Sequence, residues 1–124
     1  LISIDQVHNI QDKYGLDAPD WALKSLSTLL PKAFGRFLYA RINYSDIVVL
    51  MAGLSIDQAA KLVNGFRVIV EDHIVLIDET NFNFTVSAGV TDSVDQTLIA
   101  LLKEADNRLY LTREEGINSV GTSE

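Results

Sequence analysis

The stretch ARINYSDIVVL, residues 40–50, decides the fold, because four polar residues that favour a turn, NYSD at 43–46, separate two strand-like segments. Before the turn, residues 36–42 (RFLYARI) alternate in polarity, as a strand with one buried face does. After it, residues 47–51 (IVVLM) form an unbroken apolar run, which is typical of a buried strand. The stretch therefore predicts a β-hairpin.

A long helix is predicted on each side of this hairpin. Residues 16–35 precede it, with Asp17 as the expected N-cap, Pro19 near the first helical position and Gly35 at the far end. Behind the hairpin, Ser55 and Gln58 match a capping box. The apolar faces of the two helices are formed by Trp21, Ala22, Leu26, Leu29, Leu30 and Ala33, and by Ala59, Leu62, Val63, Phe66, Ile69 and Val70.

Strand patterns at both ends complete a β-α-β-β-α-β order. Residues 1–5 (LISID) form a short apolar strand pattern, and a helical turn is expected within residues 6–15. Residues 73–90 carry strand patterns on both sides of a polar DETN turn, and Phe82, Phe84, Val86 and Ala88 alternate inward. This order predicts an α+β fold in which helices flank an antiparallel central sheet.

A third long helix is predicted to close the domain. The sequence SVDQ at 93–96 repeats the capping-box pattern, and Leu98, Leu102, Ala105 and Leu109 form an apolar stripe that ends before Gly116. Residues 118–124 (NSVGTSE) follow as an edge strand and tail. We expect one domain over residues 1–120 and a tail or linker over 121–124. Because the chain begins inside a predicted strand, we also expect it to be a piece of a longer protein.

Composition excludes several function classes. The chain has 124 residues, 48% of them hydrophobic, which suffices for one buried core. Its net charge of −7, with ten Lys and Arg, argues against DNA as a partner. There is no cysteine, and His8 and His73 lie far apart without metal-ligand spacing, so neither histidine is expected to bind a metal. No apolar run has the length of a membrane span.

Four motifs, in this order, resemble the GGDEF family, the diguanylate cyclase domains that condense two GTP into cyclic di-GMP. Residues 1–20 resemble its opening LxDIDxFKxINDxxGHxxGD, and residues 40–50 resemble the stretch around its signature, ARxGGDEFxxL. Residues 84–91 (FTVSAGVT) resemble its TVSIGVA strand, and residues 104–120 (EADNRLYLTREEGINSV) resemble its closing ADxALYxAKxxGRNxV.

The resemblance implies a degenerate signature, formed by Asn43, Tyr44, Ser45, Asp46 and Ile47. In the family, the first acid of the opening strand and the third residue of the signature hold the metal ions that bind the triphosphate. Ser3 and Ser45 occupy these positions, and a neutral hydroxyl is a poor ligand for a hard divalent cation. Tyr44 stands where the second glycine leaves space for the nucleotide. We therefore expect no metal, no cofactor and no catalytic residue in this domain.

Two nearby acids, Asp5 and Asp46, are candidate substitute ligands. We expect neither to replace the missing carboxylates, because an acid displaced along a strand does not aim at the same site. The preferred interpretation makes Asp5 a hydrogen-bond acceptor at a strand end and Asp46 a turn residue.

The family's nucleotide contacts are retained unevenly. Gln11 replaces an asparagine of the guanine-reading pair, and Asp20 is retained. Arg113 corresponds to a phosphate-binding lysine, whereas Ile117 replaces the second cation and Pro19 replaces a glycine and lacks its N–H. Two simpler interpretations remain open. Asp20 would be favoured by the helix dipole at any helix start, and Arg113 would be a solvated residue at a helix end.

The family's inhibitory product site, an RxxD motif before the signature, is also absent by register. Its arginine and acid fall on Phe34 and Phe37, and the nearby Arg36 has Tyr39 rather than an acid three residues on. His8 replaces a lysine near the phosphates and is expected to be a solvated loop residue.

Three functions follow from the resemblance. The first is an inactive regulatory domain of a bacterial cyclic di-GMP signalling protein, which acts through domain contacts or dimerisation and controls an adjoining EAL phosphodiesterase domain. The second is a metal-independent guanine-nucleotide (GTP) sensor that uses Gln11, Asp20 and Arg113. The third is a residual diguanylate cyclase. We expect a cytoplasmic domain, and whether the full-length protein is anchored in a membrane is left open.

Overall fold

The computed structural model describes residues 1–92 and 96–122, and its elements follow the predicted order. The elements are β1 (Ile2–Ile4), α1 (Val7–Tyr14), α2 (Ala18–Phe34), β2 (Leu38–Arg41), β3 (Asp46–Leu50), α3 (Ile56–Asp72), β4 (Val75–Ile77), β5 (Thr80–Phe82), β6 (Val86–Val90), α4 (Leu98–Glu115) and β7 (Val120–Thr122). The hairpin at residues 40–50 is therefore present as β2 and β3, and the α+β fold is confirmed.

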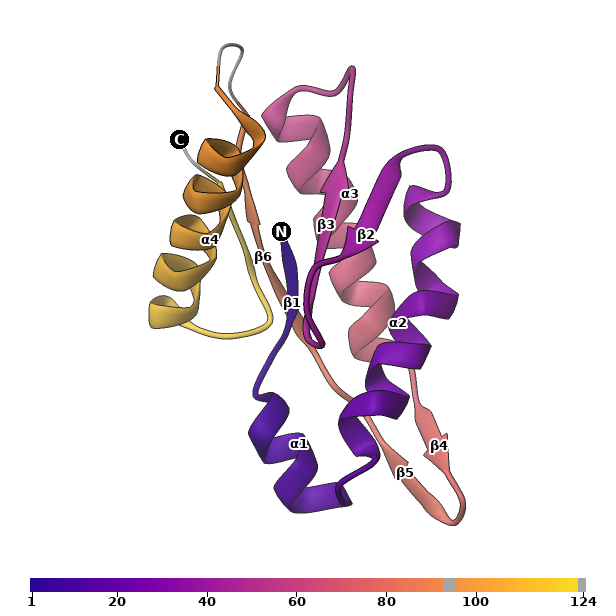
Figure 1. Ribbon diagram of the computed structural model, residues 1–124. Helices are drawn as coiled ribbons and strands as arrows, with labels where there is room; N and C mark the ends of the chain where they lie inside the picture. Colours follow the sequence, from indigo (N-terminus) through magenta and orange to yellow (C-terminus); the bar gives the residue numbers. More distant parts are fainter. Residues whose placement is uncertain (93–95, 123–124) are drawn as a thin grey trace.

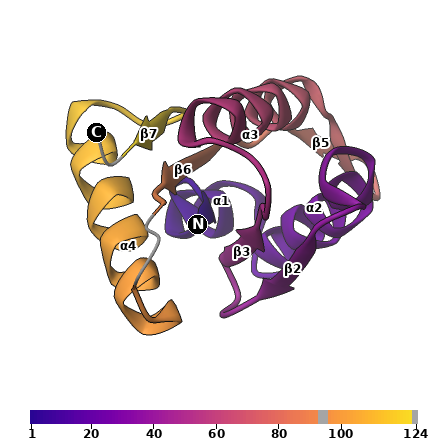
Figure 2. The same cartoon turned by 90° about the horizontal axis from the view of Figure 1, so that it is seen from above.

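One mixed sheet organises the domain. Its strand order is β2-β3-β1-β6-β7, in which the first four strands run antiparallel to their neighbours and β7 adds to β6 in parallel. Figures 1 and 2 show α2 and α3 on one side of this sheet and α4 on the other. The strands β4 and β5 form a separate hairpin below α2.

The core lies between the sheet and the pair α2 and α3. Ile2 pairs with Ile47 on one side and Ala88 on the other, so these side chains share one buried sheet face. From the helices, Phe34 and Phe66 pack together with ring centroids 5.1 Å apart. Burial of each such side chain contributes about 1.5–3 kcal/mol. Because side chains alternate along a strand, Ser3 points to the opposite face, which carries α4.

Of the predicted helix caps, the one before α3 is confirmed. Ser55 Oγ accepts from the backbone N–H of Gln58 at 3.2 Å, and Gln58 Oε1 accepts from the Ser55 N–H at 2.9 Å. The prediction for Asp17 is wrong: this residue precedes α2 but makes no capping bond, because its backbone is already helical (φ −85°, ψ −10°) rather than extended.

The start of α4 also differs from the prediction. The expected capping box at 93–96 falls largely on residues 93–95, which lie outside the described residues. In the structure, α4 begins at Leu98, and its cap is Thr97, whose Oγ1 accepts from the Ala100 N–H at 3.1 Å.

Several side chains predicted to be buried are exposed. In the apolar run at 47–51 only Ile47 is fully buried, because no described helix covers the outer face of β2 and β3, and Leu50 at the end of β3 is exposed. Trp21, Ile69 and Leu98 lie at the edges of their helical stripes and are also exposed. For Trp21, the ring instead lies under Lys24 Nζ, 4.7 Å from its centroid.

Gly89 lies where α4 packs most closely on the sheet. A Cβ at this position would overlap the backbone oxygen of Ala105 and would lie 2.8 Å from the backbone nitrogen of Leu109. The absence of a side chain at Gly89 therefore sets the distance between β6 and α4.

Candidate functional site

The tip of the β2–β3 hairpin is held by its own side chains. Asn43 Oδ1 accepts from the Ser45 N–H at 2.9 Å, which makes an Asx turn. Asn43 Nδ2 donates to Asp46 Oδ2 at 2.8 Å, and the Ser45 hydroxyl lies 3.2 Å from both Asn43 Oδ1 and Asp46 Oδ1. Tyr44 extends outward and is 55% exposed. The polar groups of the tip are thus engaged with one another.

Ser3 and Ser45 are brought together by the pairing of β1 with β3. The backbone N–H of Ile4 donates to Ser45 O at 2.9 Å, and Ser3 is paired with Asp46 on one side and Ser87 on the other. Ser3 is only 3% exposed. The two positions that would carry metal ligands in the family therefore lie on adjacent segments, one residue apart in register, and both carry hydroxyls.

These residues do not fit a pair of divalent cations. Ser3 and Ser45 supply neutral oxygens, and the Ser45 hydroxyl already lies in the hydrogen-bonded hairpin tip. Within residues 1–92 and 96–122, no group of three or more His, Asp or Glu side chains is placed to hold a metal ion. We therefore derive no catalytic step through a metal in this domain.

For Asp46, the interpretation as a turn residue is wrong. Asp46 begins β3 instead of lying in the turn, and its register partner is Ser3, so both point to the same sheet face. It is the one acid of the hairpin tip that lies beside the family's metal positions. Its two carboxylate oxygens are engaged with Asn43 and Ser45.

Asp5 forms an ion pair with Arg113. Arg113 Nε donates to Asp5 Oδ1 at 3.0 Å, and its NH2 group donates to Ser3 O and Ile4 O at 3.2 and 3.1 Å. The interpretation of Arg113 as a solvated residue is therefore wrong, because the guanidinium folds back onto the end of β1. Asp5 is buried and accepts hydrogen bonds at a strand end, as predicted.

The other nucleotide-contact candidates lie on α1, on α2 and near the end of α4. Gln11 is half-buried on α1, and Asp20 is exposed in the first turn of α2. Pro19 is buried beside Asp20, whereas His8 and Ile117 are exposed. Their roles toward a nucleotide stay predictions.

The two residues at the positions of the product-site motif, Phe34 and Phe37, make packing contacts instead. Phe34 is fully buried in the core at the end of α2, and Phe37 is half-buried beneath Arg36, whose guanidinium carbon lies 4.9 Å from the ring centroid. The side chain of Phe34 therefore contributes to packing.

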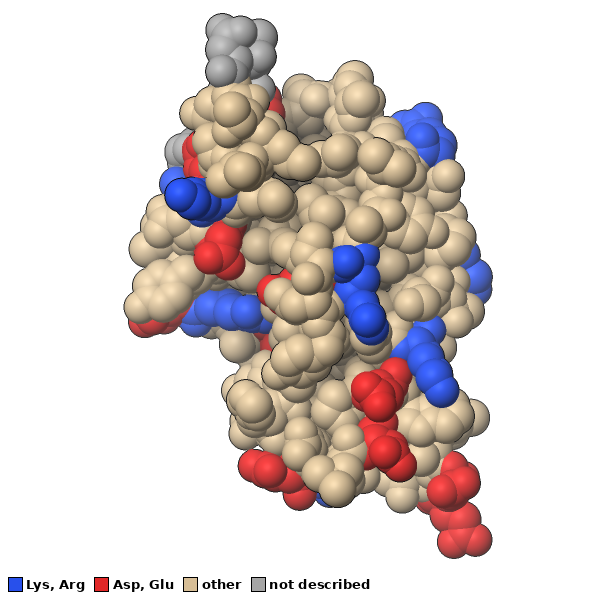
Figure 3. Space-filling view, in the orientation of Figure 1, with Lys and Arg blue, Asp and Glu red and all other residues tan. Residues whose placement is uncertain are grey.

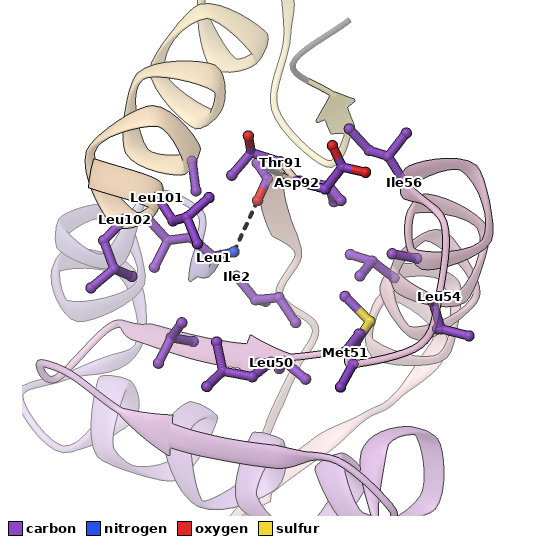
Figure 4. A pocket seen from close by; sticks show the side chains of 18 of the residues that line it. Leu1, Ile2, Leu50, Met51, Leu54, Ile56, Thr91, Asp92, Leu101 and Leu102 are labelled. Carbon is purple, nitrogen blue, oxygen red and sulfur yellow. Dashed lines mark hydrogen bonds between the residues drawn. The ribbon is translucent and has the colours of Figure 1, made fainter. Parts of the chain in front are cut away.

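An apolar cavity of about 340 Å³ opens between β3, the start of α3 and α4 (Figure 4). Leu50, Met51, Leu54, Leu101 and Leu102 are among its lining residues. Neither Ser45, Gln11, Asp20 nor Arg113 lines it. The cavity is thus separate from the candidate nucleotide contacts.

The N-terminal ammonium of Leu1 lies at this cavity and donates to Gly89 O at 2.9 Å. Burial lowers its pKa from 8.0 to about 6, and the negative charge of Asp46 acts in the opposite direction. In this 124-residue chain, folding therefore favours the neutral form of the Leu1 amine.

This shift predicts a pH dependence of stability. Between pH 6 and pH 8 the unfolded chain binds more protons than the folded chain, so the free energy of unfolding should rise with pH, by about 2 kcal/mol across that window. Urea unfolding of the 124-residue chain at both pH values measures it. Acetylation of the Leu1 amine is the control and should remove most of the rise. An equal rise in the acetylated chain would assign the effect to other groups.

Charged side chains are mixed over the visible surface. On the face shown in Figure 3, Lys and Arg are scattered among Asp and Glu instead of forming one basic patch. That face has no electrostatic footprint for a nucleic-acid backbone. In the part of the chain that the structure describes, no helix is long and apolar enough to cross a membrane.

The sequence did not predict two of the polar contacts that Asp5 makes. Asp5 Oδ2 accepts from Thr85 Oγ1 at 2.7 Å and from the backbone N–H of Asn118 at 2.9 Å. The retained asparagine of the closing GRN motif could have pointed to Asn118. No sequence signal marked Thr85.

The fold and the pairing of β1 with β3 beside the hairpin tip define the class of protein. The family model for the diguanylate cyclase GGDEF domain matches residues 1–119, and the chain belongs to this family. It is a diguanylate cyclase-like domain of cyclic di-GMP signalling. The resemblance seen in the four sequence motifs is thereby confirmed.

Individual relatives agree with this assignment. Diguanylate cyclase A of Treponema denticola is 27% identical over an aligned length of 126 residues, and the alignment covers 99% of this chain and 34% of that protein. The chain thus spans about a third of the length of this relative.

Solved structures share the fold. Diguanylate cyclase SiaD from Pseudomonas aeruginosa, in complex with its activator SiaC, has a TM-score of 0.91 and 18% identity over 98% of this chain and 48% of that one. An EAL/GGDEF domain protein from M. capsulatus has a TM-score of 0.85 and 19% identity over 99% of this chain and 81% of that one.

Proposed function

We propose that this domain is catalytically inactive and regulatory, and that it acts through contacts with neighbouring domains or through dimerisation. The observation that carries the proposal is the occupation of both metal-ligand positions by Ser3 and Ser45. The pairing of β1 with β3 brings Ser45 opposite Ile4, one residue along from Ser3, and both side chains are uncharged. Divalent cations prefer anionic oxygens and must be held against their own hydration.

The chemistry of phosphate transfer supports this proposal. Metal ions stabilise the charge that develops on the phosphates, a contribution of several kcal/mol in the transition state. The one cation retained from the family pattern, Arg113, is bound to Asp5 and to two backbone carbonyls. Ser3, Ser45 and Arg113 together therefore offer little stabilisation to a reacting triphosphate.

The regulated activity in this proposal is that of an adjoining domain in a longer cytoplasmic protein. The chain corresponds to 34% of a curated relative, and one structural neighbour is an EAL/GGDEF domain protein. Another neighbour was solved in complex with its activator. An EAL phosphodiesterase domain is the partner that the family resemblance favours.

A second candidate function is a metal-independent guanine-nucleotide sensor. It is favoured by the placement of Asp20, whose exposed carboxylate in the first turn of α2 is accessible to a base, and of the half-buried Gln11 on the neighbouring helix α1. The engagement of Arg113 by Asp5 counts against it, because binding of a triphosphate would compete with a buried acid. A residual cyclase, the third candidate, has only Asp46 beside Ser3 in its favour.

Calorimetric titration with GTP separates these candidates. In a site without a carboxylate pair, magnesium cannot couple the protein to the phosphates, so GTP affinity in magnesium should be no better than in EDTA. Metal-independent binding that is lost in Asp20→Asn would support the sensor. A tenfold or greater tightening by magnesium, about 1.4 kcal/mol, would contradict the proposed loss of the metal site.

A further inference from the structure

The carboxylate of Asp5 accepts hydrogen bonds from three separate parts of the chain. Arg113 on α4 donates to Oδ1 at 3.0 Å, while the Thr85 hydroxyl and the Asn118 N–H donate to Oδ2 at 2.7 and 2.9 Å. Asp5 is 3% exposed. A buried charge of this kind is tolerated only while its donors remain in place.

On the N-terminal side, Asp5 fixes the turn from β1 into α1. Its own N–H donates to Thr85 O at 2.9 Å, which holds the end of β1 against the segment before β6. The next residue, Gln6, has a left-handed backbone (φ 52°) and is the N-cap of α1. Helix α1 carries Gln11, one of the candidate nucleotide contacts. Asp5 therefore directly precedes the N-cap residue of α1, and its carboxylate also accepts from the Thr85 hydroxyl.

On the C-terminal side, Asp5 fixes the loop that leads into β7. Asn118, which also has a positive φ of 57°, accepts from Arg67 NH1 at 3.0 Å and donates from its side chain to Glu71. The following residue, Ser119, donates its N–H to Ser87 Oγ at 3.3 Å. Asn118 is thus a junction between the end of β1, the helix α3 and the start of β7.

The strand β7 follows this junction at the edge of the sheet. It has three residues, is half-exposed throughout, and among the strands pairs with β6 alone, while it also contacts α3 and α4. Half-exposed edge strands belong to the part of a protein that opens most readily. If the loop before β7 opened, Asp5 would lose the Asn118 N–H and its charge would be incompletely satisfied.

We propose that Asp5 couples the β1–α1 turn to the docking of β7, so that a ligand or partner bound at α1 changes how firmly β7 is held. This coupling specifies how the proposed regulatory function would work, and it rests on that function. It supplies a physical route from the candidate nucleotide contacts to the C-terminal edge of the domain. Because coupling of this kind is reciprocal, a change at β7 must also be felt at α1.

The residues that have been replaced support the same inference. In the opening pattern LxDIDxFK, the metal-binding acid is replaced by Ser3, whereas the acid at Asp5 is present. In the closing pattern GRNxV, the arginine is replaced by Ile117, whereas the asparagine at Asn118 is present. The chain has therefore lost a metal-binding acid and a phosphate-binding cation of the family pattern, and it has kept the two residues that form the junction.

Amide hydrogen exchange tests how the Asp5 contacts hold each of the two segments. In Asp5→Asn, residues 118–122 should exchange about tenfold faster, the change expected on loss of one hydrogen bond to a charged group. In Arg113→Gln, whose substitution lies on α4, residues 6–10 at the start of α1 should exchange faster by a similar factor. The matched control is Asp12→Asn, which replaces an exposed acid on α1 and should leave the exchange rates of both segments unchanged.

The outcomes are distinct. Unchanged exchange rates at the start of α1 in Arg113→Gln would overturn the proposal, because they would show no coupling. Exchange that became uniformly faster through α3 and the central strands would also overturn it, because it would show only global destabilisation. If Asp5→Asn fails to fold, Arg113→Gln still decides through residues 6–10. Since the exchange experiment contains no GTP, its failure is separate from any failure of the proposed inactivity.

Discussion

Replacing Asp5 with alanine should lower the free energy of unfolding by about 3 kcal/mol. Removal of one partner of a buried ion pair costs about 3–5 kcal/mol, because the other partner is left without compensation. The Arg113 side chain is 29% exposed and can recover part of its hydration, which places the expected loss at the lower end. Thr85 and Asn118 lose their acceptor at the same time.

Urea unfolding followed by circular dichroism measures this loss. Asp12→Ala, which removes an exposed carboxylate from α1, is the control and should change stability by no more than about 0.5 kcal/mol. A loss below about 1 kcal/mol for Asp5→Ala would mean that the Asp5 hydrogen bonds do not hold the domain together.

The second large effect is expected at Gly89, where β6 lies against α4. In Gly89→Ala the new methyl group would meet the backbone of α4 at Ala105 and Leu109. Backbone cannot rotate away as a side chain can, so the helix must shift from the sheet. Overpacking of this kind costs about 1–3 kcal/mol, and a backbone contact places the expected loss near 3 kcal/mol.

The matched control is Gly65→Ala, within α3. A Cβ at Gly65 has no neighbour within 4 Å, so the change should act through helix propensity alone and stabilise the domain by about 1 kcal/mol. Thermal or urea unfolding of both variants gives the comparison. Equal stability of Gly89→Ala and the unmodified chain would show that α4 is not seated on β6 as described.

Local sequence signals were sufficient for most of the fold. The hairpin at 40–50, the capping box of Ser55 and Gln58, and the order of helices and strands all depend on spacing within short segments. The solvent exposure of individual side chains was less predictable, because it depends on which helices cover each face of the sheet. Leu50 continues an apolar run, yet no described helix covers its side of the sheet.

The candidate site divides in the same way. The substitutions at Ser3 and Ser45 could be found by comparing motifs, since each lies within a contiguous pattern. The surroundings of Asp5 could not, because its partners lie 80, 108 and 113 residues further along the chain. Asp46 was mispredicted as a turn residue for a related reason. Its place at the start of β3, opposite Ser3, follows from the register of β3 against β1, which a linear sequence does not show.

The central claim is that this domain makes no cyclic di-GMP, and one chromatographic assay tests it directly. Purified chain and the variant Ser3→Asp/Ser45→Glu are incubated with GTP and magnesium or manganese, with an active cyclase domain as the positive control. We expect no product from either protein, because Tyr44, Pro19 and Ile117 still occupy positions where the family has two glycines and a cation. Efficient turnover by the double variant would show that the two serines are the whole defect. Cyclic di-GMP formed by the unmodified chain, and abolished by Asp20→Asn, would contradict the claim itself.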